Sequence, residues 1–191
     1  MLAIEPKNTA VLVMDLQSEI VSMLGDAATP LLQQAARVIA AARKAKLPIV
    51  YIVVGFRSGY PEVSPRNASF SSVTKSGRFA TQTPDIAATV HPLEGEVIVT
   101  KHRVGAFSGT DLEMILRAQG IDTLILFGLS TSGVVLSTVR QAADADYRLI
   151  VIKDACGDGD AEVHRVLTEK VFVRQATVTT ADDVIAALDK I

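Results

Sequence analysis

The sequence has little of what several classes of protein require. Cys156 is the one cysteine among 191 residues, so no disulfide can form within the chain, and a reducing cytoplasm is the expected location. There are 19 Lys and Arg against 21 Asp and Glu, without the basic cluster of a nucleic-acid surface. The longest apolar runs, such as residues 49–54, are too short to span a bilayer, and the N-terminus lacks the pattern of a signal peptide.

Motifs for phosphates, dinucleotides and metals are also missing. Neither a G-x-G-x-x-G fingerprint nor a P-loop occurs, which excludes the usual dinucleotide and phosphate cradles. His91, His102 and His164 are scattered and form no H-x-x-x-H or D-x-H pair. We therefore expect no metal and no cofactor, and a small molecule rather than a nucleic acid or a membrane as the binding partner.

What the sequence does contain is an alternation of short β-branched runs with segments of helical period. The length suits one domain over residues 1–191. The alternation predicts parallel strands, right-handed crossovers and helices on both faces of the sheet. The expected strands are 9–16, 48–54, 97–101, 122–128, 149–153 and 177–179, and the expected helices are 30–46, 110–119, 131–145, 162–172 and 181–189.

Local signals mark some of these boundaries. Thr110 and Glu113 have the spacing of a capping box, Gly120 is a typical helix stop, and Thr180 is expected to cap the last helix. Residues 56–96 are the exception to the alternation of strands and helices. They are rich in Ser, Thr, Pro and Gly, and their weak periodicity predicts one short helix at most. So long a loop predicts a lid, a binding loop or an oligomer contact.

In open parallel sheets, ligands bind beyond the carboxyl ends of the strands. Asp15 stands there, directly after the apolar residues 10–14, where a carboxylate is costly unless it is paired or protonated. We interpret Asp15 as a general acid or base with a raised pKa; a cap for the next segment is the alternative. Lys101 is expected to be the neighbouring cation, although an ordinary surface lysine would also suit a strand end.

Two further features fall at the same edge. The small residues from Gly128 to Gly133 form a strand-to-helix turn, whose backbone N–H groups can bind an anion or an oxyanion. An ordinary turn with a Ser or Thr cap is the alternative. Cys156 follows the fifth strand, although a lone cysteine usually serves as a small buried apolar residue.

Three segments resemble motifs of the isochorismatase-like hydrolases, also called the cysteine hydrolase family, and they occur in the family's order. Leu-Val-Met-Asp-Leu-Gln at residues 12–17 is similar to the family's opening motif. Thr-Lys-His-Arg-Val-Gly-Ala-Phe-Ser-Gly-Thr-Asp-Leu at 100–112 resembles its lysine motif. Gly-Leu-Ser-Thr at 128–131, followed by Val-Leu-Ser-Thr-Val-Arg-Gln-Ala at 135–142, is similar to the segment that normally bears the nucleophilic cysteine.

This resemblance implies a three-layer α/β sandwich with a six-stranded parallel sheet in the order 3-2-1-4-5-6. It implies a site of an aspartate, a lysine and a cysteine, of which Asp15 and Lys101 match the first two. A homodimer or homotetramer, and a cis peptide at Ser130–Thr131, are also implied. The residues expected at the substrate or its oxyanion are Leu129, Ser130, Thr131, Gly133 and Val134. Those expected to line the cleft elsewhere are Gln17, Phe56, His102, Phe107 and Cys156.

The sequence departs from the family pattern at the nucleophile. Counted from Gly128, the family's cysteine falls on Val134, and valine has neither a nucleophile nor an ionisable proton. Because removing a covalent nucleophile can cost about a million-fold in turnover, a thioester route is excluded at this position. Ser132 stands where active members often carry Asp or Asn, and residues 55–59 offer no Asp or His ligands such as the nicotinamidase branch has.

Three functional interpretations remain. In the first, the chain hydrolyses a small, carboxylate-bearing molecule with Asp15 as general acid or base, as the isochorismatase branch does with a vinyl ether, and Lys101 holds the carboxylate. In the second, it is a catalytically inactive binding protein that retains the cleft. In the third, Cys156 is a displaced nucleophile, which would require a neighbour that stabilises the thiolate.

Overall fold

A computed structural model describes residues 2–81 and 85–191. Six strands form one parallel sheet in the order β3-β2-β1-β4-β5-β6, as the sequence predicted. Every residue of β1, β2 and β4 is buried, because helices cover both faces of the central sheet. The strands are β1 (Thr9–Met14), β2 (Ile49–Val54), β3 (Val97–Lys101), β4 (Thr123–Gly128), β5 (Arg148–Ile152) and β6 (Thr177–Thr179).

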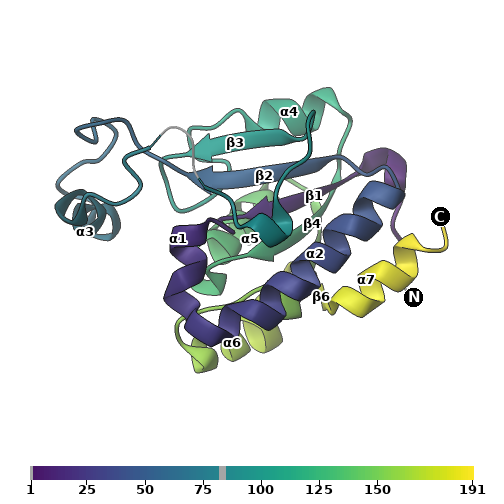
Figure 1. Cartoon of the computed structure of the whole chain (residues 1–191). Coiled ribbons are helices and arrows are strands. Elements are labelled where there is room, and N and C mark those ends of the chain that lie inside the picture. The colour runs from purple at the N-terminus through teal and green to yellow at the C-terminus, as the bar shows by residue number, and fades with distance from the viewer. Residues whose placement is uncertain (1, 82–84) are drawn as a thin grey trace.

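The helices form two layers around this sheet. In Figure 1, α2 (Ala28–Lys44) and α7 (Ala181–Leu188) lie side by side in front of it, and α5 (Leu136–Asp144) lies behind. None of the helices in the described residues has the length and apolar character needed to cross a bilayer. The other α-helices are α1 (Ser18–Val21), α3 (Ala68–Ser76), α4 (Leu112–Ala118) and α6 (Ala161–Val166). Short 3₁₀ turns are Pro6–Asn8, Ser22–Ala27, Ala88–Val90, Lys153–Ala155 and Phe172–Arg174.

Two of the expected helices begin or end differently. The helix expected at 131–145 opens with a π-helical turn, Thr131–Val135, before α5. The helix expected at 162–172 is α6 followed by a π-helical turn, Leu167–Val171. The extra backbone residue in such a turn changes the angular position of the side chains that follow it, which the apolar period alone does not reveal.

The capping predictions had different outcomes. At α7 the prediction is confirmed: the Thr180 hydroxyl accepts a hydrogen bond from the Asp183 amide, and the Asp183 carboxylate accepts one from the Thr180 amide. The capping box of Thr110 and Glu113 is wrong. The Thr110 hydroxyl donates to the Ala106 carbonyl oxygen at 2.7 Å, and α4 begins after Asp111 without a side-chain cap. A bond to the loop four residues earlier therefore replaces the predicted bond between the Thr110 hydroxyl and the Glu113 amide.

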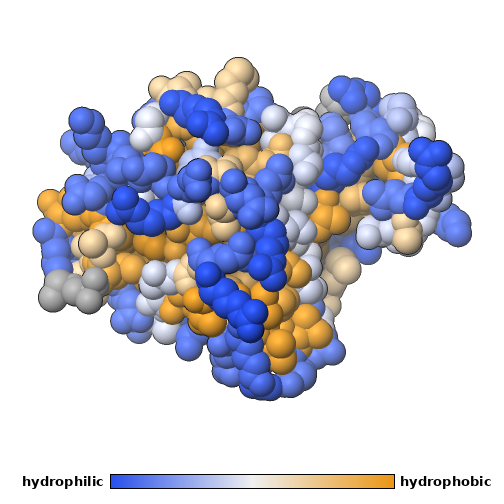
Figure 2. All heavy atoms as spheres, turned by 180° about the vertical axis from the view of Figure 1, so that it is seen from behind, coloured by the Kyte–Doolittle hydropathy of each residue, from blue (hydrophilic) through white to orange (hydrophobic). Residues whose placement is uncertain are grey.

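In its described residues, the long segment after β2 contains one α-helix, α3, as the sequence allowed. Asn67 caps α3 by accepting a hydrogen bond from the Phe70 amide, and Gly77 ends it with a φ of 70°. In Figure 1, α3 stands off the sheet on the side to which β2 and β3 point. Figure 2 shows this lobe from behind, with apolar atoms where it meets the main body. Residues 82–84 of the predicted 56–96 segment lie outside the described residues, and a role as lid or oligomer contact stays a prediction.

The carboxyl ends of β1 and β4 approach each other very closely at Gly128. Its φ is 147°, and a Cβ atom placed on it would lie 1.9 Å from the Met14 carbonyl oxygen. Glycine is therefore required at this position for both backbone conformation and space. The contact sets the distance between the end of β1, where Asp15 follows, and the turn that follows β4.

Replacement of Gly128 by alanine tests this contact. Gly128→Ala is expected to lower the free energy of unfolding by more than about 4 kcal/mol, because a backbone atom must move. Gly120→Ala is the matched control, since Gly120 has a φ of 67° but open space around its Cα, and should cost only about 1 kcal/mol. Urea denaturation of both variants measures the difference. Equal losses would show that the close approach is unimportant.

Candidate functional site

Asp15 and Lys101 meet at the carboxyl edge of the sheet. Asp15 directly follows β1, and Lys101 is the last residue of β3. Because β2 lies between these two strands, the lysine side chain reaches across one strand. Lys101 Nζ lies 2.9 Å from Asp15 Oδ2, and their side chains are only 3% and 7% exposed. Asp15 has a left-handed φ of 54°, a conformation that non-glycine residues rarely adopt and that is often found at functional sites.

The two oxygens of the Asp15 carboxylate have different surroundings. Oδ2 receives the lysine, whose Nζ also donates to the Arg103 carbonyl oxygen at 3.1 Å. Oδ1 is buried and has no hydrogen-bond partner among the described residues. An unpartnered buried oxygen is unusual in a native structure, so Oδ1 is the atom of this pair that is available to a ligand or a water molecule.

Burial raises the pKa of Asp15 above its usual 3.8, and the opposing effect of the Lys101 charge and hydrogen bond is smaller. The native protein thus keeps this proton at pH values where the unfolded chain has lost it. The contribution of Asp15 to stability is therefore greatest below pH 3.8 and decreases as the pH rises through its native pKa. A carboxyl group in this state can serve as a general acid.

The ion pair opens into a cavity of about 490 Å³. Its lining is mainly apolar, with a few polar groups at defined places, as small-molecule sites usually are. The residues come from the carboxyl ends of β1, β2 and β3 and the segments that follow them, which include the long segment, and from the turns after β4 and β5. They are Asp15, Ile20, Met23, Leu24, Val54, Phe70, Ser72, Val73, Arg78, Phe79, Lys101, Val104, Leu129, Ser130, Gly133, Val134, Asp158 and Gly159.

The turn after β4 forms one wall. The Ser130 hydroxyl accepts a hydrogen bond from the Gly133 amide at 3.1 Å, and the Asp158 carboxylate accepts one from the Ser132 amide at 2.7 Å. The cis peptide is Leu129–Ser130, so the expected position at Ser130–Thr131 is wrong by one residue. Leu129 still bridges to Gly157 at the sheet edge, and the chain reverses directly after it.

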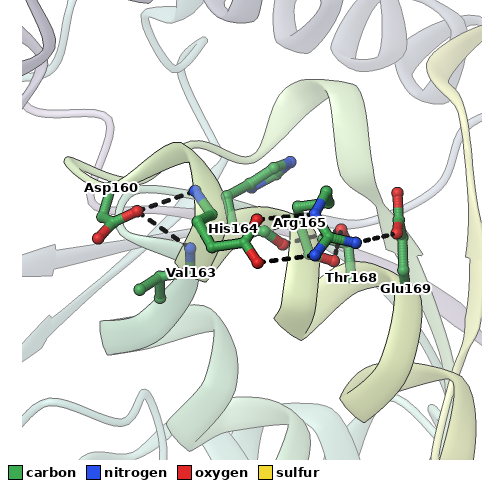
Figure 3. A network of polar contacts seen from close by, with 7 residues as sticks. Asp160, Val163, His164, Arg165, Thr168 and Glu169 are labelled. Carbon is green, nitrogen blue, oxygen red and sulfur yellow. Dashed lines mark hydrogen bonds and ion pairs between the residues drawn. The ribbon is translucent and has the colours of Figure 1, made fainter.

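Thr131 is the one residue of the expected oxyanion set that does not line the cavity. Its hydroxyl is fully buried, 2.9 Å from the Gly157 carbonyl oxygen and 2.8 Å from His164 Nδ1. His164 belongs to α6, which Asp160 caps, and Arg165 of the same helix pairs with Glu169 of the π-helical turn that follows (Figure 3). Burial lowers the pKa of His164. Thr131 and His164 therefore join the turn to α6 instead of facing a ligand.

Residues 9–183 match the model of the isochorismatase domain family. The chain belongs to the isochorismatase family of hydrolases. The uncharacterized isochorismatase family protein YecD of Escherichia coli O157:H7 is 31% identical over 98% of this chain and 100% of its own length. The ureidoacrylate amidohydrolase RutB of Variovorax paradoxus is 29% identical over 95% of this chain and 82% of its own length. The family predicted from the sequence motifs is thus confirmed.

The fold of solved family members agrees. An isochorismatase family protein from Burkholderia thailandensis superposes with a TM-score of 0.84 at 26% identity, and the match covers 98% of both chains. The strand order and the layers of helices described above are therefore those of a known isochorismatase-family structure. The ion pair lies at the edge of the sheet where the sequence argument expected the site.

Four of the residues expected to line the cleft lie elsewhere. The Gln17 side chain binds the Val54 backbone, with its Oε1 2.7 Å from the amide and its Nε2 3.0 Å from the carbonyl oxygen. Phe56 and His102 line a separate cavity of about 180 Å³. Phe107 is buried against Tyr147, with ring centroids 5.9 Å apart. Position near the end of a strand predicted their neighbourhood but not the direction of their side chains.

Cys156 is also outside the cavity lining. Its thiol is buried, and burial raises its pKa to about 12, although a backbone hydrogen bond at Gly128 lowers it slightly. Asp154 also raises it, so the stabilising effect of the Gly128 backbone on a thiolate is outweighed. Of its two sequence interpretations, Cys156 therefore fits that of a small buried apolar residue. Its surroundings are unfavourable for the other, a displaced nucleophile, because that role requires a stable thiolate.

Several lining residues escaped sequence analysis. Ile20 belongs to α1, Met23 and Leu24 belong to the 3₁₀ turn after it, and Asp158 follows β5 by several residues. The long segment contributes a further group, comprising Phe70, Ser72, Val73, Arg78 and Phe79. The only feature of the sequence that could have indicated this wall of the cavity was the presence of two phenylalanines and an arginine in a Ser-rich, weakly periodic segment. In the described part of the chain, no group of three or more His, Cys, Asp or Glu side chains could hold a metal ion.

Thiol labelling tests the environment of Cys156. At pH 8 the native protein should react with iodoacetamide about a thousand-fold more slowly than the urea-unfolded chain, because the thiolate is scarce at a pKa of about 12. Mass spectrometry of time points measures both rates. A native rate within tenfold of the unfolded rate would contradict the buried, protonated thiol.

Proposed function

We propose that this chain hydrolyses a small, carboxylate-bearing molecule by general acid–base chemistry of Asp15, without a cysteine nucleophile. The observation that carries the proposal is the free oxygen Asp15 Oδ1, buried beside Lys101 and bordering the cavity. A carboxyl group with a raised pKa and one uncommitted oxygen is equipped to donate a proton to a bound substrate and to recover it.

Val134 supports a route that needs no thiol. It lines the same cavity, is 2% exposed, and presents an aliphatic side chain at the position that the motif count assigns to the nucleophile. The single cysteine of the chain does not line that cavity. A covalent step would therefore lack its attacking atom, and water has to be the nucleophile in this mechanism.

The proposed reaction has two proton transfers. The protonated Asp15 Oδ1 donates its proton to the substrate atom that becomes basic as the bond to the leaving group breaks. Water adds to the resulting electrophilic carbon, and its proton returns to the Asp15 carboxylate. Lys101 stabilises the carboxylate between these steps through Oδ2. The backbone N–H groups of Leu129, Thr131, Ser132 and Gly133 already donate to protein acceptors, so this mechanism does not rely on an oxyanion hole in the turn after β4.

The relatives and the cavity support the substrate class. Ureidoacrylate, for which the RutB relative is named, carries a carboxylate and a ureido group. A cavity of about 490 Å³ with a mainly apolar wall suits a molecule of that size. The valine at residue 134 occupies part of the wall of the cavity that Asp15 also lines, which favours a narrow substrate.

A second candidate function is that of a binding protein without catalysis. The same aliphatic side chain of Val134 favours it, because an enzyme that lost its nucleophile keeps the cavity and the fold. The buried ion pair would then have a structural role, which such pairs often have. Tight binding of a small carboxylate without turnover distinguishes this function from hydrolysis.

Substitution of the proposed acid tests the hydrolase. In a screen of vinyl ethers, small amides and small esters, Asp15→Asn should lower kcat/KM by at least about 100-fold, since the amide cannot supply the proton. Asp26→Asn makes the same charge change at an exposed position and should leave the activity intact, as should Cys156→Ser. Activity that survives Asp15→Asn rejects the mechanism, and activity lost in Cys156→Ser revives the thiol.

The titration of Asp15 provides a test that needs no turnover. Carbon-13 NMR of its side-chain carboxyl, assigned by its loss in Asp15→Asn, should give a pKa above 3.8. Lys101→Met should move this pKa further up, because it removes the charge and the hydrogen bond that lower it. A pKa at or below 3.8, or one that falls in Lys101→Met, would contradict the account of the ion pair.

A further inference from the structure

The cavity contains a second cation whose place in the site the sequence did not reveal. Arg78 belongs to the long segment after β2, directly beyond α3, and its side chain lines the same cavity as Asp15 and Lys101. These are the two positively charged side chains among its described lining residues. Their surroundings differ in a way that decides which of them meets an anionic ligand.

Lys101 is largely committed to the protein. Its side chain is 3% exposed, and its ammonium group already contacts the Asp15 carboxylate and the Arg103 carbonyl oxygen. Once Asp15 has donated its proton, a substrate carboxylate placed on Lys101 would lie next to the Asp15 carboxylate, and two close negative charges repel each other strongly at a buried site. The sequence-based expectation that Lys101 holds the carboxylate therefore meets an electrostatic obstacle.

Arg78 is available by comparison. Its side chain is 34% exposed, and its guanidinium group lies over the Phe79 ring, 5.1 Å from the centroid, which supports one face of the plane. Its Nε donates to Glu19, whose own side chain is 45% exposed, and one terminal nitrogen contacts the Met23 sulfur at 3.0 Å. A thioether is a weak acceptor, and a half-exposed glutamate returns easily to water.

We propose that Arg78 is the residue that selects a carboxylate-bearing substrate, by binding that carboxylate at the mouth of the cavity. This inference rests on the proposed function, since it assigns the two ends of the substrate. The carboxylate binds the guanidinium in the paired geometry that arginine favours, and the hydrolysed bond lies at Asp15 Oδ1. The part between them packs on apolar lining residues, namely Phe70, Val73, Phe79, Val104 and Val134.

Binding of matched ligands tests the assignment. The probes are succinamate, which carries one carboxylate, and succinamide, its neutral counterpart, and isothermal titration calorimetry measures both. All proteins keep Asp15, because its removal would free Lys101 to bind the carboxylate, and NMR of each ligand before and after a titration checks that none is consumed. With Arg78 present, succinamate should bind more tightly than succinamide. Arg78→Gln should weaken succinamate binding about ten- to a hundred-fold and leave succinamide unchanged, because the lost hydrogen bonds are made to a charged group.

Two variants serve as controls. Arg66→Gln removes the same charge from an exposed position of the same segment and should leave both affinities unchanged. Arg78→Lys keeps the charge without the planar fork and should recover part of the affinity for succinamate. Equal losses in Arg78→Gln and Arg66→Gln, or no preference for succinamate at millimolar concentration, would overturn the proposal.

The outcomes for Arg78 and for the hydrolase are separable. If the chain with Asp15 intact hydrolyses nothing, yet Arg78 confers the preference for succinamate, the acid–base mechanism fails and the binding role of Arg78 stands. If the chain hydrolyses small amides or vinyl ethers but shows no preference for the carboxylate through Arg78, the binding role fails and the mechanism stands.

Discussion

The buried contact between Asp15 and Lys101 is the constraint around which the edge of the sheet is arranged. Bringing a carboxylate and an ammonium group out of water is costly, and the cost is offset only when the two remain in contact. Their 2.9 Å separation depends on parallel strands in the order β3-β2-β1, which places both residues at one edge. The left-handed backbone of Asp15 and the bond from Lys101 to the Arg103 carbonyl oxygen hold the pair in this geometry.

The surroundings of this pair decide what chemistry it supports. Burial raises the pKa of Asp15, while the lysine occupies only one of its two oxygens, so a proton and a free acceptor exist at the same carboxyl group. The aliphatic side chain of Val134 borders the cavity, and the thiol of Cys156 is buried outside its lining. These features support the proposal that water is the attacking group, in a chain whose relatives include an amidohydrolase.

The long segment after β2 supplies the wall that the family motifs do not cover. Sequence patterns predicted one short helix there but could not place Phe70, Arg78 or Phe79, because their neighbours in space lie far away in the chain. The same limit explains the misplaced residues. Gln17 lies two residues after Asp15, yet its side-chain amide binds the Val54 backbone, which is 37 residues away in the chain. That choice depends on a non-local partner.

The sequence by itself determined the family, the order of strands and helices, and the residues at the carboxyl ends of the strands. Apolar runs and helix signals indicate local secondary-structure preference and burial, and the motifs indicate common ancestry. These features can therefore be recognised from the order of residues alone. Only the tertiary structure decided which oxygen of Asp15 is free, that Cys156 is excluded from the cavity lining, and that Arg78 reaches it. Those facts depend on side-chain directions and on contacts between distant segments, and neither is encoded in local spacing.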